Sequence, residues 1–182
     1  EAAEMSGEST SRTDLNIPDA QKDLLKKLVK TGKPVVLVLF AGRPLTLVWE
    51  EENVPAILDV WFPGTEAGYA VADVLFGDVN PSGKITATFP RSVGQVPISY
   101  NYKHTGRAPL KEKPSEKYRT GYIDETYEPL YPFGYGLSYT QFEYSDLTLD
   151  KEVINSNEYL TASITITNKG TVDGKEIVQL YL

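Results

Sequence analysis

The run Pro34-Val-Val-Leu-Val-Leu-Phe40 decides the fold of the first part of this chain, because every residue after the proline is aliphatic or aromatic. A strand that is buried on both faces reads as a continuous apolar run, and such strands are typical of parallel sheets covered by helices. The run is broken by Ala41-Gly-Arg-Pro44, where glycine and proline interrupt regular structure. The sequence therefore predicts a buried strand of an α/β layer over residues 34–40.

The segments on either side of this strand alternate between helix and strand patterns. Upstream, residues 19–31 predict an amphipathic helix that stops at Gly32. Its expected apolar stripe is formed by Leu24, Leu25, Leu28 and Val29. Downstream, residues 56–61 predict a short strand that ends at Pro63-Gly64. Alternation of helix and buried strand indicates α/β layers.

The next segments continue this pattern up to residue 89. Residues 68–76 predict a helix closed by Gly77, and its inward-facing residues are expected to be Ala70, Val71, Val74 and Leu75. Asn80-Pro-Ser-Gly83 predicts a turn, and residues 84–89 alternate like a strand. The alternation of helix and strand patterns is therefore expected to extend to residue 89.

The character of the sequence changes twice after residue 91. Residues 92–139 are rich in proline, glycine, tyrosine and charge. Beyond Gln141, three short strands are predicted over 142–149, 159–168 and 175–182, with turns at Asn168-Lys-Gly170 and Asp173-Gly174. This last pattern is typical of the start of an antiparallel β-sandwich.

Composition excludes several classes of function. The net charge is −7 and no cluster of Lys or Arg stands out, so neither a nucleic acid nor an anionic membrane is expected as a partner. No apolar run approaches the length that spans a bilayer. The chain has no cysteine and one histidine, which argues against thiolate catalysis, cysteine-based zinc sites and a Ser-His-Asp triad. No cofactor or metal is indicated.

Because the chain lacks an initiating methionine and stops inside an apolar run, we expect it to be a piece of a longer protein.

The opening segment, residues 1–12, has the composition of a functional loop. It carries three carboxylates, Glu1, Glu4 and Glu8, and an arginine, Arg12, among small polar residues. It shows no apolar periodicity, so packing does not explain its composition, and catalytic groups are commonly placed on loops of a rigid scaffold. The alternative interpretation is an acidic, solvated terminus.

Several segments, taken together and in order, resemble one enzyme family. They are Ser6-Gly-Glu-Ser-Thr-Ser-Arg12, Leu15-Asn-Ile-Pro18 with Gln21, Gly32-Lys-Pro-Val-Val-Leu-Val-Leu39, Gly42-Arg-Pro-Leu45, Trp61-Phe-Pro-Gly-Thr-Glu-Ala-Gly68, Ala72-Asp-Val-Leu-Phe-Gly-Asp78, Asn80-Pro-Ser-Gly-Lys84, Phe89-Pro90 and Tyr131-Pro-Phe-Gly-Tyr-Gly-Leu-Ser-Tyr139. Any one of these motifs is weak evidence. The whole set resembles the C-terminal portion of glycoside hydrolase family 3, the β-glucosidase and β-xylosidase family.

The resemblance implies a fold and a division into domains. Residues 1–100 would form the C-terminal half of an α/β sandwich domain, 101–140 a connector rich in Tyr, Pro and Gly, and 141–182 a truncated fibronectin type III-like domain. The resemblance also implies an N-terminal barrel domain, absent from this sequence, that carries the catalytic nucleophile aspartate. The chain would then contact that barrel as its intramolecular partner.

The resemblance assigns Glu8 as the general acid/base, because Glu8 lies in the pattern Ser-Gly-Glu-x-x-Ser-Arg. A Ser11-Arg12 pair stands where the family often has Asp-Arg. Glu1 and Glu4 remain as alternatives. Arg12 could orient a carboxylate, but an ion pair with Asp14 or an acidic helix neighbour is an equal alternative, so Arg12 is not placed in the site.

Other residues favour structural roles. Trp61 and Phe62 are expected to pack in a core rather than stack on a sugar, and Gly64 and Gly68 to allow close packing of a helix on a sheet. Arg107 is expected in a surface or interdomain salt bridge rather than on a substrate.

The resemblance implies an exo-acting, retaining β-glucosidase that hydrolyses terminal, non-reducing β-D-glucosyl residues of glucosides or oligosaccharides. A β-xylosidase of the same family and a non-catalytic carbohydrate-binding or structural module are the alternatives. A periplasmic or secreted location is implied as well. The isolated chain is expected to be inactive, since the nucleophile would lie on the barrel.

Overall fold

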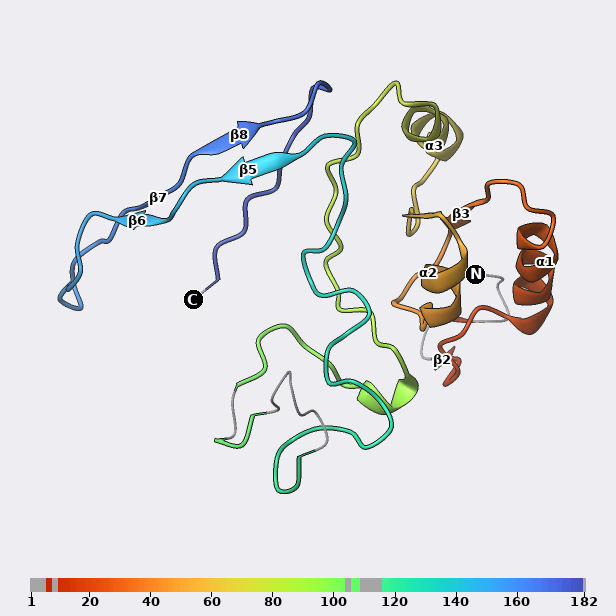
Figure 1. Ribbon diagram of the computed structural model, residues 1–182, viewed down its shortest axis with the longest axis horizontal. Helices are drawn as coiled ribbons and strands as arrows, with labels where there is room; N and C mark the ends of the chain where they lie inside the picture. Colours follow the sequence, from red (N-terminus) through yellow and green to blue (C-terminus); the bar gives the residue numbers. More distant parts are fainter. Residues whose placement is uncertain (1–5, 8–9, 104–105, 109–115, 182) are drawn as a thin grey trace. The chain divides into compact units, whose positions relative to one another are not determined.

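The computed structural model describes residues 6–7, 10–103, 106–108 and 116–181 of the chain (Figure 1). These residues divide into two compact units. The first unit comprises Glu1–Gly68 and Ile85–Tyr135, and the second comprises Tyr69–Lys84 and Gly136–Leu182. Across the described ranges, no helix combines the length and apolarity needed to cross a membrane.

The first predicted helix is present as α1 (Asp19–Val29). Asp19 in its first turn and two lysines in its last turn complement the helix dipole. Gly32 follows with φ of +72°, a backbone conformation that glycine adopts without strain. The predicted apolar stripe is only partly buried: Leu25 is buried, whereas Leu24 and Leu28 are exposed.

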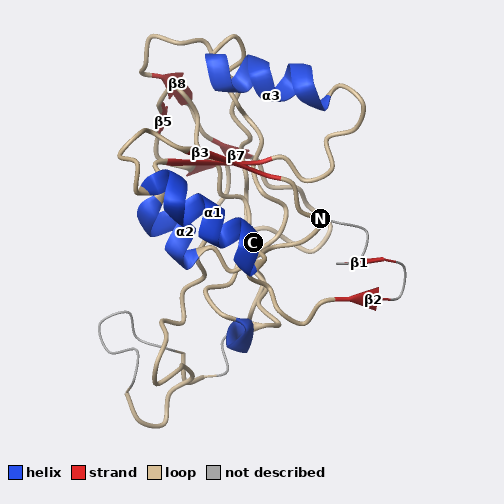
Figure 2. Ribbon diagram, turned by 90° about the vertical axis from the view of Figure 1, so that its right-hand side faces the viewer, coloured by secondary structure: helices blue, strands red, loops and turns tan. Residues whose placement is uncertain are grey.

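The parallel sheet predicted from the apolar run is also present. Strands β3 (Val36–Leu39) and β4 (Ala56–Asp59) pair in parallel, with Val36 opposite Ala56. The short helix α2 (Val48–Asn53), which the sequence did not predict, lies in the crossover between them (Figure 2). A helix between two parallel strands is the unit from which α/β folds are built.

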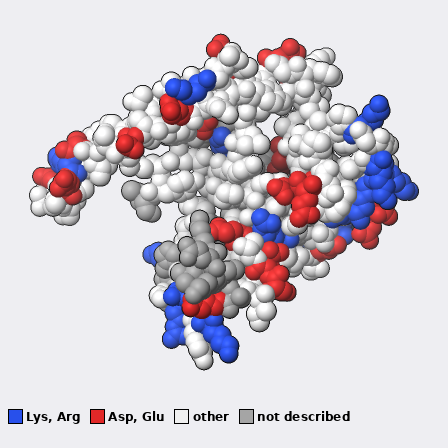
Figure 3. Space-filling view, in the orientation of Figure 1, with Lys and Arg blue, Asp and Glu red and all other residues white. Residues whose placement is uncertain are grey.

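Helix α1 contacts α2 through charge. Lys22 and Lys26 of α1 place their Nζ atoms 5.9 and 5.6 Å from the ring centroid of Trp49 in α2. Lys22 also forms an ion pair of 3.3 Å with Glu50, whose side chain is completely buried. Figure 3 shows Lys and Arg side chains gathered over α1. Two lysines of this helix, Lys22 and Lys26, also contact Trp49 of α2.

The core of the first unit forms where β3 and the loop after it meet residues from earlier and later in the chain. Its buried members are Ile17, Leu39, Ala41, Leu45, Leu47, Phe89 and Leu130. Trp61 packs against this cluster, with its ring centroid 5.8 Å from that of Phe89. Because Ala41 and Leu47 are each 1% exposed, the segment 41–47 is firmly held by burial on both sides of Arg43.

The strand predicted over residues 84–89 is wrong as a regular element. Phe89 forms an isolated antiparallel bridge with Tyr131, with the Phe89 amide 2.9 Å from the Tyr131 carbonyl oxygen. Ile85 pairs in the same direction, since its amide donates to the Tyr135 carbonyl oxygen at 2.8 Å. The two segments therefore exchange backbone hydrogen bonds without forming a continuous ladder.

The tyrosine-rich segment packs largely against itself. Tyr100 stacks on Phe133 with ring centroids 4.4 Å apart, and Tyr127 lies 6.1 and 6.4 Å from Tyr102 and Tyr122. Gln95, at the end of the short 3-10 helix Val93–Gln95, is 2% exposed. Its amide donates to the carbonyl oxygens of Thr126 and Glu128 and so anchors this segment.

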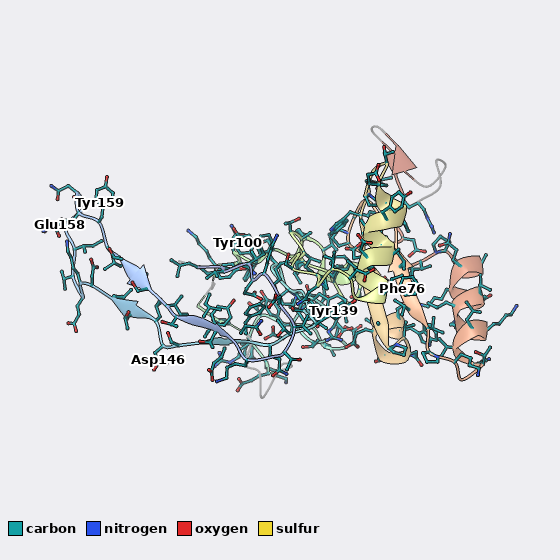
Figure 4. All side chains as sticks on the ribbon, turned by 90° about the horizontal axis from the view of Figure 1, so that it is seen from above. Phe76, Tyr100, Tyr139, Asp146, Glu158 and Tyr159 are labelled. Carbon is teal, nitrogen blue, oxygen red and sulfur yellow. The ribbon has the colours of Figure 1, made fainter. Side chains whose placement is uncertain are left out.

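In the second unit, the predicted helix is present as α3 (Ala67–Phe76), which begins just before the boundary between the units. Gly77 closes it with φ of +85°. The predicted inward face is not buried: Val71 and Val74 are half-buried, while Ala70 and Leu75 are exposed. Phe76, at the end of the helix, is 84% exposed (Figure 4).

The first two predicted C-terminal strands pair as one antiparallel ribbon. Strand β5 (Phe142–Tyr144) pairs with β8 (Ile166–Asn168), and β6 (Thr148–Leu149) pairs with β7 (Ala162–Ser163). Three residues separate β5 from β6, but only two separate β7 from β8. One extra residue on one side is the definition of a β-bulge, and it explains why each predicted strand is interrupted. Tyr159 and Glu158 lie at the far end of the ribbon (Figure 4).

Two other expectations for the second unit are wrong. The described part of the predicted third strand, residues 175–181, contains no regular strand. The predicted turn at residues 80–83 is not a regular turn, because Asn80 bonds to distant segments instead. Its Oδ1 accepts hydrogen bonds from the Tyr139 amide and the Ser138 hydroxyl, and its Nδ2 donates to the Asp173 carbonyl oxygen.

Candidate functional site

The candidate site begins with two short strands. β1 (Ser6–Gly7) and β2 (Thr10–Ser11) pair antiparallel, with Ser6 opposite Ser11 and Gly7 opposite Thr10 (Figure 2). Glu8 stands between these strands in the sequence and lies outside the described residues, as do the alternatives Glu1 and Glu4. The structure therefore describes the strands that flank Glu8 in the sequence.

Arg43 joins the segment after β2 to the loop after β3. Its Nη1 atom donates hydrogen bonds to the Ser11 hydroxyl at 2.8 Å and to the Arg12 carbonyl oxygen at 2.6 Å. Its Nη2 atom lies 3.5 Å from the Asp14 carbonyl oxygen. One guanidinium group thus binds Ser11, Arg12 and Asp14, which lie about 30 residues away in the sequence.

Thr46, three residues after Arg43, makes a second connection to the same segment. Its amide donates to the Leu15 carbonyl oxygen at 2.9 Å, and its hydroxyl donates to Asn16 Oδ1 at 2.8 Å. Thr46 is 6% exposed whereas Asn16 is exposed, so these bonds are shielded from water on the Thr46 side. Segment 11–16 is therefore attached at two points to one buried loop.

Asp14 shapes the segment between these two points. Its Oδ1 accepts hydrogen bonds from the Asn16 backbone amide at 2.9 Å and from the Asn16 side-chain amide at 2.7 Å. The backbone and side-chain hydrogen bonds from Asn16, helped by the charges of Arg12 and Arg43, lower the pKa of the Asp14 carboxyl. The ionised carboxylate is the form that accepts both bonds.

Arg12 takes one of the two roles that the sequence left open. Its Nη2 atom lies 3.4 Å from Asp14 Oδ2, so Arg12 forms the ion pair with Asp14. Both side chains are partly exposed, and a surface pair of this length contributes little to stability.

A cavity of about 280 Å³ lies beside this segment in the first unit. Polar side chains of Arg12, Asn16, Gln21 and Arg43 and the apolar residues Leu37 and Leu39 are among those that line it. The cavity therefore brings the residues after β2, the start of α1 and strand β3 to one place.

The end of β4 supplies a further carboxylate. Burial raises the pKa of the Asp59 carboxyl, and the hydrogen bond from the Trp61 amide to Asp59 Oδ1, 3.3 Å long, opposes that rise. Trp61 has φ of +48°, an uncommon conformation for a residue other than glycine. Trp61 packs in the core as predicted, but the prediction for Phe62 is wrong, because its side chain is 71% exposed.

The structure also bears on the predictions for Gly64 and Gly68 and for Arg107. Close packing does not explain Gly64 and Gly68, since a Cβ atom at either position would have nothing within 4 Å among the described residues. Gly64 instead has φ of +77°, which favours glycine. The side chain of Arg107 is exposed, and its carbonyl oxygen accepts a hydrogen bond from the Thr120 amide at 2.9 Å.

Within the described ranges, no group of three or more His, Cys, Asp or Glu side chains could hold a metal ion. The described part of this segment and the loop after β3 offer carboxyl, hydroxyl and guanidinium groups, those of Asp14, Ser11, Arg12 and Arg43. Sequence reasoning missed Arg43 and Thr46, because each acts through backbone carbonyls and polar atoms far away in the chain. Only the motif Gly42-Arg-Pro-Leu45 marked this loop.

These features define an α/β unit that holds a polar N-terminal segment beside the loop that follows a parallel strand. The sequence profile of the glycosyl hydrolase family 3 C-terminal domain matches residues 1–139. The chain belongs to glycosyl hydrolase family 3, as its motifs indicated.

Relatives agree with this assignment. The chain is 53% identical over its whole length to a periplasmic beta-glucosidase of Salmonella typhimurium and covers 24% of that protein. It is 47% identical, over 97% of its length, to a beta-xylosidase of Formosa agariphila and covers 23% of it. The crystal structure of a beta-glucosidase from Listeria innocua in complex with glucose matches with a TM-score of 0.89 and 45% identity, over 96% of this chain and 24% of that one. The chain thus spans about a quarter of the length of these relatives.

Proposed function

We propose that this chain is part of an exo-acting, retaining β-glucosidase that hydrolyses terminal, non-reducing β-D-glucosyl residues. The observation that carries the proposal is the 53% identity, over the entire chain, to a relative named periplasmic beta-glucosidase. Solved relatives in complex with glucose and with laminaribiose support a carbohydrate substrate.

In the proposed reaction, Glu8 is the general acid/base. Its protonated carboxyl donates a proton to the glycosidic oxygen while the bond from that oxygen to the anomeric carbon breaks. A nucleophilic aspartate on the proposed barrel domain forms a bond to the same carbon. Glu8, now ionised, then removes a proton from the water that displaces the aspartate, which restores both groups. The Ser-Gly-Glu-x-x-Ser-Arg motif supports Glu8 over Glu1 and Glu4.

The same proposal assigns domains and a location. Residues 1–100 would be half of an α/β sandwich, 101–140 a connector and 141–182 the start of a fibronectin type III-like domain. The antiparallel pairing of β5 with β8 and β6 with β7 supports the last assignment. A periplasmic or secreted location is supported by the printed name of the Salmonella relative.

Replacing Glu8 by Gln in the full-length enzyme tests the proposed role. General acid–base groups contribute about 10²- to 10⁴-fold to rate, so E8Q should lose that much kcat/KM on a glucoside with a poor leaving group such as cellobiose. The kcat/KM for 2,4-dinitrophenyl β-glucoside should change little, because that leaving group needs no proton. Azide should raise kcat on the activated substrate, because it attacks the glycosyl-enzyme without needing a base.

Matched variants decide among the carboxylates. E1Q and E4Q test the two alternatives, and E152Q removes the charge of an exposed glutamate of the second unit. Unchanged turnover of cellobiose by E8Q would rule out Glu8. The 182-residue chain by itself should hydrolyse no aryl glucoside. Hydrolysis of an aryl glucoside by the purified chain would contradict the proposal that the active site is shared with a barrel domain.

A β-xylosidase is the second candidate, because a relative so named is 47% identical over nearly the whole chain. The ratio of kcat/KM for 4-nitrophenyl β-glucoside and β-xyloside separates the two activities. No turnover of either glycoside by the full-length protein would favour a non-catalytic carbohydrate-binding or structural module.

A further inference from the structure

We propose that Arg43 is a positioning residue for the general acid/base: it fixes strand β2, and through β2 the paired strand β1, the two strands that flank Glu8 in the sequence. This inference rests on the proposed function, since it concerns the same reaction. Arg43 itself is not expected to touch the substrate or transfer a proton.

The contacts of Arg43 fit this role better than a purely local one. Its bonds of 2.8 and 2.6 Å reach Ser11, the last residue of β2, and the carbonyl oxygen of Arg12 next to it. A charged donor makes hydrogen bonds about twice as strong as a neutral one. Ser11 is opposite Ser6 in the β1–β2 pair, so a restraint on Ser11 also restrains β1.

The loop that carries Arg43 is rigid enough to serve as an anchor. Ala41 and Leu47, on either side of it, are each 1% exposed and belong to the core of the first unit. Thr46 adds a second attachment through its bonds of 2.9 and 2.8 Å to Leu15 and Asn16. Two attachments prevent the segment from rotating about either one.

Accurate placement matters because proton transfer depends steeply on geometry. Misplacement of a catalytic group by about 1 Å can cost about 100-fold in rate. Residues that touch no substrate hold catalytic groups in place through hydrogen bonds of this kind. A planar guanidinium can reach a hydroxyl and a carbonyl at once, whereas a lysine ammonium would act as a single point charge.

The test compares two substrates in the full-length R43A enzyme. We expect kcat/KM for cellobiose to fall by about 100-fold, because the proton donor is misplaced. We expect kcat/KM for 2,4-dinitrophenyl β-glucoside to change little, because its departure needs no proton. KM for the activated substrate should stay near the wild-type value, and R43K should recover part of the lost activity on cellobiose.

Two milder variants keep the proposal testable if R43A does not fold. S11A removes one exposed acceptor and should give a smaller loss of the same selective kind. R119A is the matched control, because the Arg119 guanidinium also donates to a side-chain oxygen and a backbone carbonyl oxygen, those of Glu116 and Ala108, in an exposed part of the first unit. R119A should leave the ratio of the two kcat/KM values unchanged.

The outcomes separate this proposal from the one on which it rests. An equal loss on both substrates, or no loss, in R43A, R43K and S11A would overturn the positioning role, while a selective loss in E8Q would leave the proposed function intact. An unimpaired E8Q would overturn the proposed function itself, whatever the Arg43 variants do.

Discussion

The two units of this chain differ in how they are held together. In the first unit, seven buried apolar residues form a cluster around β3 and the loop after it. In the second unit, the ribbon has paired backbones but exposed side chains, such as Val153 at 85% and Tyr159 at 91% exposure. Hydrogen-bonded pairing by itself leaves a two-stranded ribbon only marginally stable. The first unit is therefore stabilised mainly by burial, and the second by side-chain hydrogen bonds between segments.

Removal of a large side chain from each unit should reveal the largest difference in stability between the two units. Phe89 is 2% exposed, so F89A should cost about 4 kcal/mol through lost burial and the cavity left behind. Y159A, in the second unit, should stay within about 0.5 kcal/mol, because its ring is 91% exposed.

Amide hydrogen exchange in the full-length protein, resolved by peptide, would measure both variants. F89A should increase exchange over β3 and β4 and leave the ribbon unchanged. Similar losses in the two variants would contradict the proposed difference between the units.

A smaller loss of stability is expected when the side-chain hydrogen bonds of the second unit are removed. N80A removes three hydrogen bonds, to Ser138, Tyr139 and Asp173, and should destabilise this unit by about 2 kcal/mol, because water replaces part of what is lost. Exchange of the Tyr139 amide reports the loss directly.

Two variants of intermediate severity sharpen this expectation. N80D keeps an acceptor for the Tyr139 amide and loses the donor to Asp173, so its effect should lie between the wild type and N80A. S138A removes one of the bonds and should have the smallest effect. An N80A protein as stable as the wild type would show that burial, and not these hydrogen bonds, stabilises the second unit.

The smallest effect is expected from the ionisation of Asp59. Burial raises the pKa of Asp59 in the folded state, so its contribution to stability is fully present below its unfolded value and is lost as pH rises through the folded pKa. D59N removes this ionisation and should raise Tm by about 2 °C at neutral pH and by nothing at pH 3.

Asp14 supplies the control of opposite sign. Its folded pKa is lowered, so its contribution is present above the unfolded value and is lost as pH falls through the folded pKa. D14N should therefore lower Tm at neutral pH and leave it unchanged in acid. Tm measured across this range checks both signs, and a D59N curve that follows that of D14N would contradict the burial of Asp59.

Local patterns predicted the regular elements well where the pattern was long. Residues 19–31 and 68–76 indicated α1 and α3, and the apolar run at 34–40 indicated a parallel strand, which β3 and β4 form. The segment 84–89 alternates in sequence, yet it forms only an isolated bridge at Phe89 and a separate pair of backbone hydrogen bonds at Ile85. Alternation reports which side chains face a core, and not whether a partner strand continues beside it.

The exposed apolar faces of α1 and α3 show a different limit. Leu28 is 45% exposed and Leu75 is 40% exposed, although both lie on stripes that predict burial. A stripe shows that a face is able to pack, whereas burial depends on which other segments are present to cover it. The bulge in the ribbon was not predictable either, because it depends on the count of residues between pairs on two strands.

Local sequence patterns sufficed for the family, for helix α1 and the parallel strands β3 and β4, and for the motif that contains Glu8, because these depend on residues close together in the chain. The tertiary structure alone decided that Arg43 and Thr46 hold the segment after β2, and that Arg12 pairs with Asp14 rather than with a helix residue. The contacts of Arg43 and Thr46 join polar atoms and carbonyl groups about 30 residues apart, and no local pattern encodes such a meeting. It follows only from the way in which the buried loop 41–47 places its side chains.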